Sequence, residues 1–286
     1  MSLREGDENN PFSFAPFAAH PFYTTVNRSL VQQALAGNAR PRSTPLTIVD
    51  LACGTGAVTR LIAEEVARQG RQAHILGVDP SAQALRLAQH TMAGMGIGGR
   101  VEFIQGDADD LLDLVHDADV AFFCNAMHLL AEKRAAFERL AAILAPGGVF
   151  ACNSAFYEGA SEEATIRFSR LWIRRAVGLL RKAHPEVRIS REGKVAARQW
   201  LTPEAYMSLL QQSGFGQVRV RQELVELSLD SVRDLGHYWL FIEGALPGVP
   251  LALGATALGT TVDQVASELG MTSVPRFWLQ LLATKA

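Results

Sequence analysis

The sequence has only three cysteines among 286 residues, and no two of them form a CxxC pair. Cys53, Cys124 and Cys152 are far apart, and each lies in or beside an apolar stretch. Isolated cysteines in such surroundings are typical of buried, inert thiols. This scarcity argues against a disulfide framework and against a cysteine-based metal site, and we expect no bound metal ion.

Long apolar runs and a secretory leader pattern are also missing. The most apolar late stretch, residues 235–259, is interrupted by Glu243, Pro247 and Pro250. No run therefore reaches the roughly 18 apolar residues that a membrane-spanning helix needs. Acidic residues stand at positions 5, 7 and 8, where a signal peptide would be basic and then apolar. We expect a cytoplasmic protein without a membrane span.

The chain as a whole lacks an excess of one charge sign. It has 27 Lys and Arg against 29 Asp and Glu, a formal charge of −2, so we expect no binding to double-stranded nucleic acid. The balance is uneven, because residues 161–200 hold ten Lys and Arg and four Glu. Such a segment can attract an anionic or carrier-bound acceptor, although charge runs more often form a solvated surface.

Short apolar runs alternate with amphipathic stretches between residues 46 and 155. This alternation requires right-handed βαβ crossovers and predicts an α/β fold with a doubly wound, Rossmann-like, mostly parallel sheet. The runs are almost continuously apolar, as expected for strands covered on both faces. The predicted strands are 46–51, 73–78, 101–105, 120–124 and 149–153, and the predicted helices are 57–69, 81–95 and 132–144.

The patterns divide the chain into four parts. Residues 1–45 form an N-terminal arm with a helix from Thr25 to Leu35, residues 46–155 the Rossmann-like core, and residues 156–200 a basic helical cap with a helical pattern across 161–200. Residues 201–286 complete the sheet. That last part has a helix at 203–212, strands at 218–227 and 276–284, and a helical insertion at 229–274.

The first predicted strand leads through a glycine-containing loop directly into a helix. The loop reads Asp50-Leu51-Ala52-Cys53-Gly54-Thr55-Gly56. Glycines here allow a tight turn and close approach of a ligand to the backbone at a helix N-terminus. Asp79 ends the second strand, 23 residues after Gly56, where a carboxylate can accept both hydroxyls of a ribose. The loop therefore predicts a cofactor that contains a nucleoside.

Further polar residues follow the next strands in order. Gly106-Asp107-Ala108 follows the third strand, Asn125 follows the fourth, and Ala145-Pro146-Gly147-Gly148 precedes the fifth. Each has an ordinary explanation alone, such as a turn at Asp79-Pro80 or a helix cap at Asp107. Because the carboxyl ends of parallel strands meet at one edge of a sheet, their joint occurrence indicates one ligand site.

This ordered set resembles the class I S-adenosylmethionine-dependent methyltransferases, of the type that act on small molecules. The resemblance covers roughly residues 46–155, and the rest of the chain more loosely. It implies a seven-stranded sheet whose last strand is antiparallel, together with a helical lid. It also implies S-adenosyl-L-methionine as cofactor and S-adenosyl-L-homocysteine as product. The chain departs from the pattern at Ala52, where many members carry glycine.

The resemblance implies roles for individual residues. Asp50, Gly54 and Gly56 hold the methionine end of the cofactor, and Asp79 holds the ribose. Asn125 lines the methionine moiety near the transferable methyl group. Asp107 and Ala108 hold the adenine. The full cofactor-binding set is Asp50, Cys53, Gly54, Gly56, Asp79, Pro80, Asp107, Ala108 and Asn125.

A nicotinamide dinucleotide is the rival cofactor, because a glycine loop followed by an acid is also a dinucleotide fingerprint. Three observations favour adenosylmethionine. Thr59 stands at the third glycine position, and none of the four tyrosines has a lysine four residues later, as a short-chain dehydrogenase would require. Asp50 would sit poorly beside a pyrophosphate but can pair with the ammonium group of methionine.

Three residues are candidates for the chemistry. His128 lies just beyond the fourth strand, at the edge where open sheets bind ligands. It could act as a base that deprotonates a phenol or an acid, or it could pack the cofactor pocket. The resemblance implies an aromatic N-terminal arm folded over the pocket, with Tyr23 or His20 near cofactor or substrate. The alternative for these two residues is an apolar strap on the core.

We therefore expect a methyltransferase that moves a methyl group from S-adenosylmethionine to a small, partly apolar acceptor, with oxygen favoured as the receiving atom. An anionic acceptor fits if the basic segment contacts it. Two alternatives stay open. One is a binding, regulatory or non-methylating module, with a homodimer formed through residues 245–274, and the other, less favoured, is a nicotinamide-dependent oxidoreductase.

Overall fold

The computed structural model describes residues 12–93, 99–190 and 200–286. A seven-stranded sheet runs through it in the order β3-β2-β1-β4-β5-β7-β6. β7 is antiparallel to both of its neighbours, β5 and β6, and the remaining pairs are parallel. The strands are β1 Leu46–Leu51, β2 Ala73–Asp79, β3 Gly99–Gln105, β4 Ala118–Cys124, β5 Leu144–Ser154, β6 Phe215–Ser228 and β7 Ser273–Lys285.

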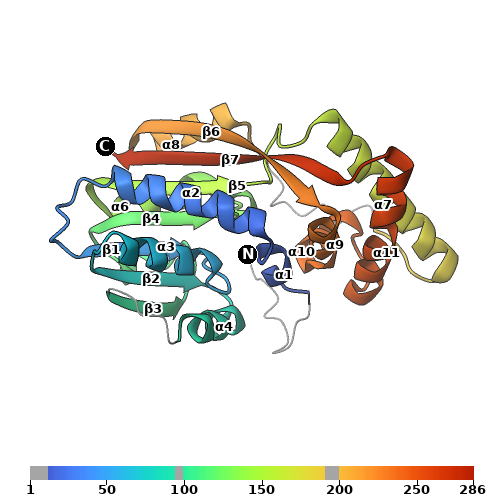
Figure 1. Ribbon diagram of the computed structural model, residues 1–286, viewed down its shortest axis with the longest axis horizontal. Coiled ribbons are helices and arrows are strands. Elements are labelled where there is room, and N and C mark those ends of the chain that lie inside the picture. The colour runs from blue at the N-terminus through green and yellow to red at the C-terminus, as the bar shows by residue number, and fades with distance from the viewer. Residues whose placement is uncertain (1–11, 94–98, 191–199) are drawn as a thin grey trace.

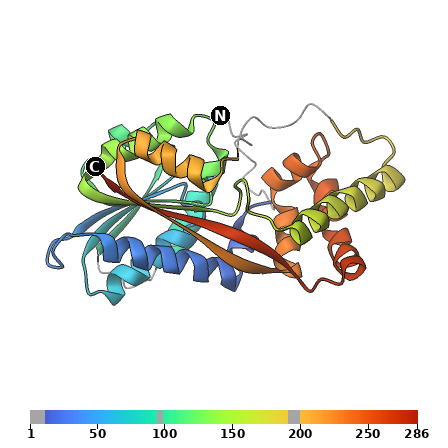
Figure 2. The same ribbon diagram turned by 90° about the horizontal axis from the view of Figure 1, so that it is seen from above.

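Helices cover both faces of the sheet (Figure 2). α2 and α3 lie on one face, and α6 and α8 lie on the other. Three of the helical elements, α1, α5 and η1, are single short turns. The core helices are α1 Ala15–Ala18, α2 Pro21–Gly37, α3 Ala57–Arg68, α4 Ala82–Met92, α5 Leu111–Leu114, η1 Met127–Leu129, α6 Lys133–Ile143 and α8 Pro203–Gln212.

The apolar strands fill a separate hydrophobic core on each face, as the sequence predicted. Successive residues of a strand point to opposite faces. Val120 and Phe122 of β4 accordingly belong to the cluster with α2 and α3, while Ala121 and Phe123 belong to the cluster with α6. All four are at most 2% exposed, so β4 is covered on both sides. The predicted Rossmann-like fold, with an antiparallel last strand, is confirmed.

A group of four helices, which we call the helical cap, lies beyond the carboxyl ends of the parallel strands (Figure 1). It comprises α7 Glu163–Ala183, α9 Leu229–His237, α10 Trp239–Ala245 and α11 Leu251–Leu269. Trp172 of α7 donates to the carbonyl of Leu258 in α11 at 2.8 Å and stacks on Phe241 of α10. The long strands β6 and β7 connect this group to the sheet.

The predicted bounds of two helices need comment. Within the described residues 161–190, the predicted helical pattern forms one helix that ends at Ala183, because Pro185 disfavours helical geometry at His184, whose ψ is 68°. The basic residues predicted at 191, 194 and 198 lie outside the described residues. The arm helix begins at Pro21 rather than Thr25, since proline suits the first helical position and His20 before it is extended.

The segment 245–274 packs inside the chain for much of its length. In α11, Ala257, Leu258, Val262 and Val265 are at most 2% exposed, and they belong to the same core cluster as the buried residues of α7 and α9. Among the described residues, no helix is both long and apolar enough to cross a membrane.

Candidate functional site

The loop between β1 and α3 turns through three residues with left-handed backbone angles. Ala52 has φ 54°, Gly54 φ 54° and Gly56 φ 82°. A Cβ added to Gly54 would meet nothing within 4 Å, whereas one on Gly56 would lie 3.1 Å from the Cβ of Ala88 in α4. Gly54 thus leaves its backbone open to a ligand, and Gly56 allows close helix packing. Ala52 adopts a conformation that glycine takes more easily, which accounts for the glycine that many members of the family carry at this position.

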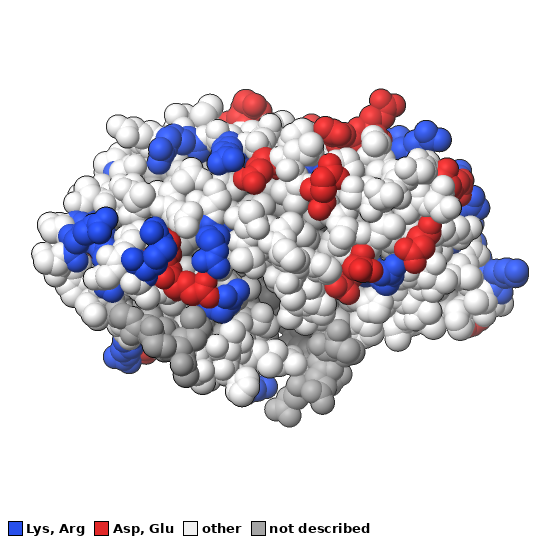
Figure 3. Space-filling view, viewed as in Figure 1, with Lys and Arg blue, Asp and Glu red and all other residues white. Residues whose placement is uncertain are grey.

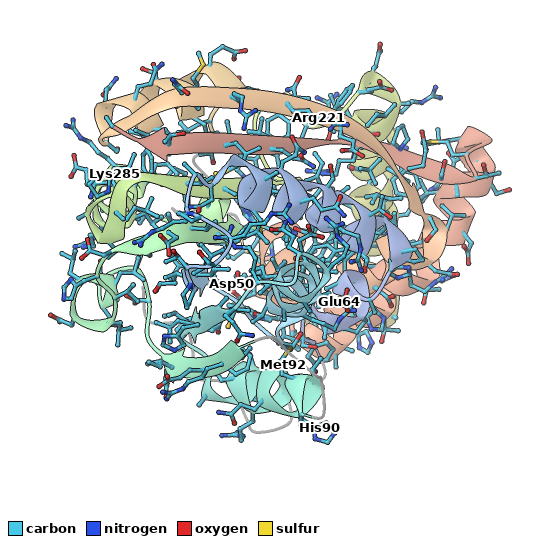
Figure 4. All side chains as sticks on the ribbon, turned by 60° about the vertical axis from the view of Figure 1, so that its left-hand side comes forward. Asp50, Glu64, His90, Met92, Arg221 and Lys285 are labelled. Carbon is cyan, nitrogen blue, oxygen red and sulfur yellow. The ribbon has the colours of Figure 1, made fainter. Side chains whose placement is uncertain are left out.

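Asp50 is a buried acid with no positive partner among the described residues. It is 1% exposed, and Thr59 donates its hydroxyl to the Asp50 Oδ2 at 2.6 Å. Burial raises the pKa of Asp50 to about 7, and the nearby Asp79 adds to this rise. Figure 4 shows Asp50 inside the fold, whereas His90 and Lys285 lie at its outer edges. A buried carboxylate without a cation fits a ligand ammonium group.

Asp79 joins the glycine loop to the end of β2. Its Oδ2 accepts from the backbone N–H of Gly54 at 2.8 Å, and its Oδ1 accepts from that of Ser81 at 2.9 Å. Burial raises the pKa of Asp79. Each carboxylate oxygen can accept more than one hydrogen bond, so both retain capacity for a pair of vicinal hydroxyls.

The remaining predicted cofactor residues lie along the same edge. Asp107 is exposed, and its Oδ1 accepts from the Asp109 N–H at 2.7 Å, while Ala108 beside it is buried. The carbonyl of Pro80 accepts from Gln105 at 3.0 Å, which joins the loops after β2 and β3. Cys53 is a free buried thiol, as are Cys124 and Cys152, and burial raises the pKa of all three.

Asn125 occupies the left-handed region, with φ 57°, directly after β4. Its N–H donates to the Asn153 Oδ1 at 3.0 Å, and its own Oδ1 accepts from the Ala155 N–H at 3.2 Å. Asn153 in turn donates to Asn27 of α2 at 2.9 Å. The Nδ2 of Asn125 is buried and has no partner in the described chain. An orphaned donor of this kind fits an oxygen of a bound ligand.

We call the carboxyl edge of the parallel strands the donor edge, because the predicted cofactor-binding residues lie there. Of the two candidates in the aromatic arm, only Tyr23 lies near Asp50. Tyr23 is 5% exposed and packs against Trp278, and burial together with the charges of Cys124 and Asp50 raises the pKa of its hydroxyl. His20 instead pairs with Asp234 of α9, with the Nε2 and Oδ2 atoms 2.7 Å apart. Tyr23 therefore lies near Asp50, which is predicted to hold the methionine end, and His20 connects the arm to the helical cap.

His128 lies at the exit of β4, where the sequence predicted it, in an environment that disfavours its charged form. Its Nδ1 is 3.2 Å from the Oγ of Ser154, and its ring centroid is 4.6 Å from that of Phe156. Burial, with smaller contributions from Lys133 and Arg276, lowers its pKa to about 3. The imidazole is thus neutral throughout the physiological range and is a weak proton acceptor.

The basic residues of α7 face outward. Arg167, Arg170, Arg174 and Arg181 are exposed, and Arg175 pairs with Glu268 of α11 at 2.7 Å. On the face of the molecule in Figure 3, Lys and Arg are interspersed with Asp and Glu over the right-hand part, which is the helical cap. The described part of the basic segment therefore forms a solvated surface rather than a lining of the donor edge.

Sequence reasoning missed two contributors to the site. In the sequence, Thr59 was noted only because it stands where a dinucleotide fingerprint has its third glycine. In the structure, its hydroxyl donates to the Asp50 carboxylate and so orients it. Arg276 counted only as the first residue of a strand, yet its guanidinium stacks over Phe156, 4.9 Å from the ring centroid. A hydroxyl residue one helical turn into α3 is a local signal that could have indicated Thr59. The role of Arg276 depends on the register between β7 and β5.

No group of three or more His, Cys, Asp or Glu is arranged for a metal ion in the part of the chain that the structure describes. A cavity of about 710 Å³ lies at the opposite edge, near the amino ends of β1 and β2, and is lined by residues that include Arg40, Arg68 and Arg71. None of its lining residues is among the predicted cofactor-binding residues, which lie at the carboxyl edge of the parallel strands.

Comparison with known proteins gives the same result. Residues 48–148 match the family described as methyltransferase domain. Over 101 residues the chain is 28% identical to the ubiquinone/menaquinone biosynthesis C-methyltransferase UbiE of Pseudomonas savastanoi. This alignment covers 35% of this chain and 38% of that protein. Over 107 residues the chain is 35% identical to trans-aconitate 2-methyltransferase of Acidovorax sp. strain JS42, and this alignment covers 37% of each protein. The chain thus spans less than two fifths of the length of these relatives.

The fold is also shared over nearly the whole chain. A solved loganic acid methyltransferase with S-adenosylhomocysteine superposes with a TM-score of 0.64 over 98% of both chains, at 9% identity. The dinucleotide-binding Rossmann fold has the strand order 3-2-1-4-5-6, whereas this sheet inserts the antiparallel β7 between β5 and β6. Motifs, strand order and family match agree: residues 48–148 are a methyltransferase domain, and the sheet has the fold of the class I S-adenosylmethionine-dependent methyltransferases.

Proposed function

We propose that this protein transfers a methyl group from S-adenosylmethionine to an oxygen atom of a small, partly apolar acceptor. The observation that carries the proposal is the set of unused polar groups at one edge of the sheet. Within the described residues, Asp50 is buried without a cation and Asn125 has a buried donor without an acceptor. Asp79 retains two oxygens for hydroxyls, and the backbone at Gly54 is open.

These groups match the parts of the cofactor in order. Asp50 would pair with the ammonium and the Asn125 amide would donate to the carboxylate of the methionine end. Asp79 would accept from the two ribose hydroxyls, and Asp107 with Ala108 would contact the adenine. When bound, the cofactor supplies a methyl group on a positively charged sulfur.

The arm and the helical cap would exclude water from this edge. Phe14 of the arm packs on Tyr238 at the start of α10, with ring centroids 5.1 Å apart. The charge of Asp79 adds to burial in raising the pKa of Tyr238, which puts this tyrosine close to the ribose-binding acid. Exclusion of water and alignment of the acceptor are the main contributions an enzyme makes to an in-line displacement.

The transfer itself requires little acid or base chemistry. The bond between the methyl carbon and sulfur breaks, a bond from that carbon to oxygen forms, and the electron pair stays on sulfur. A hydroxyl acceptor must also lose a proton, whereas an acceptor that is already an anion has none to lose. The low pKa of His128 favours a positioning role for its neutral ring.

Acceptor choice would reside at the exits of β4 and β5 and in the helical cap. Phe156 packs between His128 and Trp200, with ring centroids 4.6 and 6.2 Å away. This aromatic surface suits a partly apolar molecule. One relative is named for C-methylation in ubiquinone and menaquinone biosynthesis and another for methylation of trans-aconitate, and our proposal for this chain is oxygen.

A regulatory binding module is the alternative class. A silent site has no physical need for a buried, uncompensated Asp50, which destabilises the unliganded fold. A homodimer through residues 245–274 finds little support, because α11 turns much of its apolar surface inward.

Titration of the purified protein with S-adenosylmethionine, S-adenosylhomocysteine and NAD tests the proposal. We expect binding of the first two, no binding of NAD, and methyl transfer from labelled cofactor to an acceptor in a small-molecule extract. Absence of binding to both sulfur ligands would refute the proposal. Binding without transfer to any acceptor would support the regulatory alternative.

A further inference from the structure

Arg276 lies where β7 extends past the carboxyl end of β5. β7 runs antiparallel to β5, and its Leu279 pairs with Ser154, the last residue of β5. The residues of β7 that precede Leu279 therefore reach beyond the sheet, at the edge where the donor groups lie. There Arg276 pairs in backbone register with Val225 of β6.

The guanidinium of Arg276 is held in place but is not fully used. Its Nε donates to the carbonyl of Ala155 at 2.6 Å, and its Nη1 is 3.5 Å from the Oγ of Ser161. Its Cζ lies over the ring of Phe156, 4.9 Å from the centroid. Within the described residues the Nη2 group has no hydrogen-bond partner. A fixed guanidinium with free N–H groups is suited to bind a planar anion.

No carboxylate of the described chain neutralises this guanidinium. The neighbouring cation Lys133 is 6% exposed and donates only to the carbonyl of Leu130, at 2.7 Å. Both cations contribute to lowering the pKa of His128, so both lie near its imidazole. Burial lowers the pKa of Arg276 to about 10, which still leaves it charged at neutral pH. Charges removed from water are ordinarily paired, so the absence of an acid here fits an anionic ligand.

The surroundings of Arg276 match the remainder of such a ligand. Phe156 and Trp200 provide aromatic faces, and Trp200 is 40% exposed. His128 beside them has a pKa too low to take a proton from a hydroxyl at neutral pH. A carboxylic acid has already lost its proton at that pH and needs no base.

We propose that Arg276 is the acceptor-binding residue of this site and that the acceptor is a small unsaturated or aromatic carboxylate. The carboxylate pairs with the free N–H groups of the guanidinium, and the apolar body packs on Phe156. This inference rests on the proposed function, because the site it describes adjoins the methyl donor. It differs from the expectation that the basic residues of α7 attract an anionic acceptor, because the arginines at 167, 170, 174 and 181 are exposed to solvent.

The test measures probe binding to the full chain saturated with S-adenosylhomocysteine. The probes are benzoate and cinnamate, each matched by its neutral amide, and trans-aconitate as an aliphatic acid. The variants are Arg276→Gln, the charge-conserving Arg276→Lys, and Arg174→Gln as a control on the exposed face of α7. Thermal unfolding and S-adenosylhomocysteine affinity are measured for each variant.

We expect the wild type to bind carboxylates more tightly than amides. Arg276→Gln should weaken carboxylate binding roughly 10- to 100-fold, as expected for loss of a charged hydrogen-bond donor. Arg276→Lys should retain part of the affinity, and Arg174→Gln should change it less than twofold. S-adenosylhomocysteine affinity should stay unchanged in all three.

Equal binding of acids and amides by the wild type, with S-adenosylhomocysteine bound, would overturn this inference and leave the proposed function intact. Unchanged carboxylate affinity in both Arg276 variants would do the same. Failure of the wild type to bind S-adenosylhomocysteine would instead refute the proposed function itself.

Discussion

The proposed donor edge and the proposed acceptor region of this molecule are built in different ways. The donor groups lie on short loops that directly follow β1 to β4, so sequence order fixes their order in space. The acceptor region joins the exit of β5 to β7, residues that are 121 apart in the chain at the Ala155–Arg276 contact. Local motifs define the first region, and long-range packing defines the second. Substitutions in the two regions should therefore affect different ligands.

The largest effect is expected at Asp79. Asp79→Ala removes the acceptor for two ribose hydroxyls and for the Gly54 N–H. Loss of two hydrogen bonds to a charged group should weaken S-adenosylhomocysteine binding by about 100-fold or more. Isothermal titration measures this loss, with the exposed Asp113→Ala as the matched control. An affinity within a few-fold of wild type would break the assignment of the ribose site.

Asp50 should give a strong dependence of cofactor affinity on pH. Its pKa of about 7 in the free protein means that a proton must leave before the carboxylate can pair with an ammonium group. S-adenosylhomocysteine should therefore bind about tenfold more weakly at pH 6 than at pH 8. In Asp50→Asn the affinity should be lower and flat over this range. A wild type with equally flat behaviour would contradict the ammonium pairing.

The same residue should also reveal a conflict between stability and function. Its folded pKa lies above the unfolded value of 3.8, so Asp50 destabilises the unliganded fold increasingly as pH rises from about 4 to 7. Asp50→Asn should stabilise the free protein on the order of 2–4 kcal/mol at pH 8, and by much less near pH 4. Denaturant unfolding at the two pH values measures the difference.

Arg276 should show the opposite selectivity to Asp79. Arg276→Gln should raise the KM for a carboxylate acceptor roughly tenfold or more, and leave the affinity for S-adenosylhomocysteine unchanged. Steady-state kinetics with the acceptor as the varied substrate gives this result. A matching loss of cofactor affinity would mean that the two regions are not separable.

His128 should have a smaller effect on turnover. A general base contributes about 100- to 10,000-fold, whereas we expect His128→Gln to lower kcat by less than about tenfold. The pH profile of kcat should also lack a limb near pH 6.5, because the pKa of His128 is about 3. A larger loss together with such a limb would restore His128 as the base.

The smallest expected effect is at Ala52. Its φ of 54° is unfavourable for an L-residue by roughly 1–2 kcal/mol, and glycine would remove this strain. Glycine also raises the conformational entropy of the unfolded chain, which cancels part of the gain in stability. Ala52→Gly should therefore raise the free energy of unfolding by about 0.5–1 kcal/mol. Cofactor affinity should not fall. A destabilised variant would mean that the loop holds alanine without strain.

The sequence was informative where periodicity and strand-end motifs act locally. It predicted the five parallel core strands and the tight loop through Asp50 and Gly54, because each depends on a few neighbouring residues. The cofactor-binding roles of Asp79 and Asp107 remain predictions. It overestimated α7, since helical periodicity alone does not register the break before Pro185. It also suggested that the arginines of α7 contact an anionic acceptor, because a count of charges does not show whether the side chains point to the site or to solvent.

Arg276 could not be recognised in this way. Its importance arises from the pairing of Leu279 with Ser154, which sets how far β7 extends past β5. Strand register of this kind depends on packing between segments more than a hundred residues apart. His20 is a similar case, since its contact with Asp234 forms only when the arm meets α9.

A crystal structure with S-adenosylhomocysteine tests the central claim most directly. We predict that the ribose hydroxyls lie within hydrogen-bond distance of the Asp79 carboxylate and the ligand ammonium within that of Asp50. The sulfur should point toward the space between His128, Phe156 and Arg276. A ligand bound at another edge, or a sulfur directed away from Arg276, would contradict the division into a donor edge and an acceptor region.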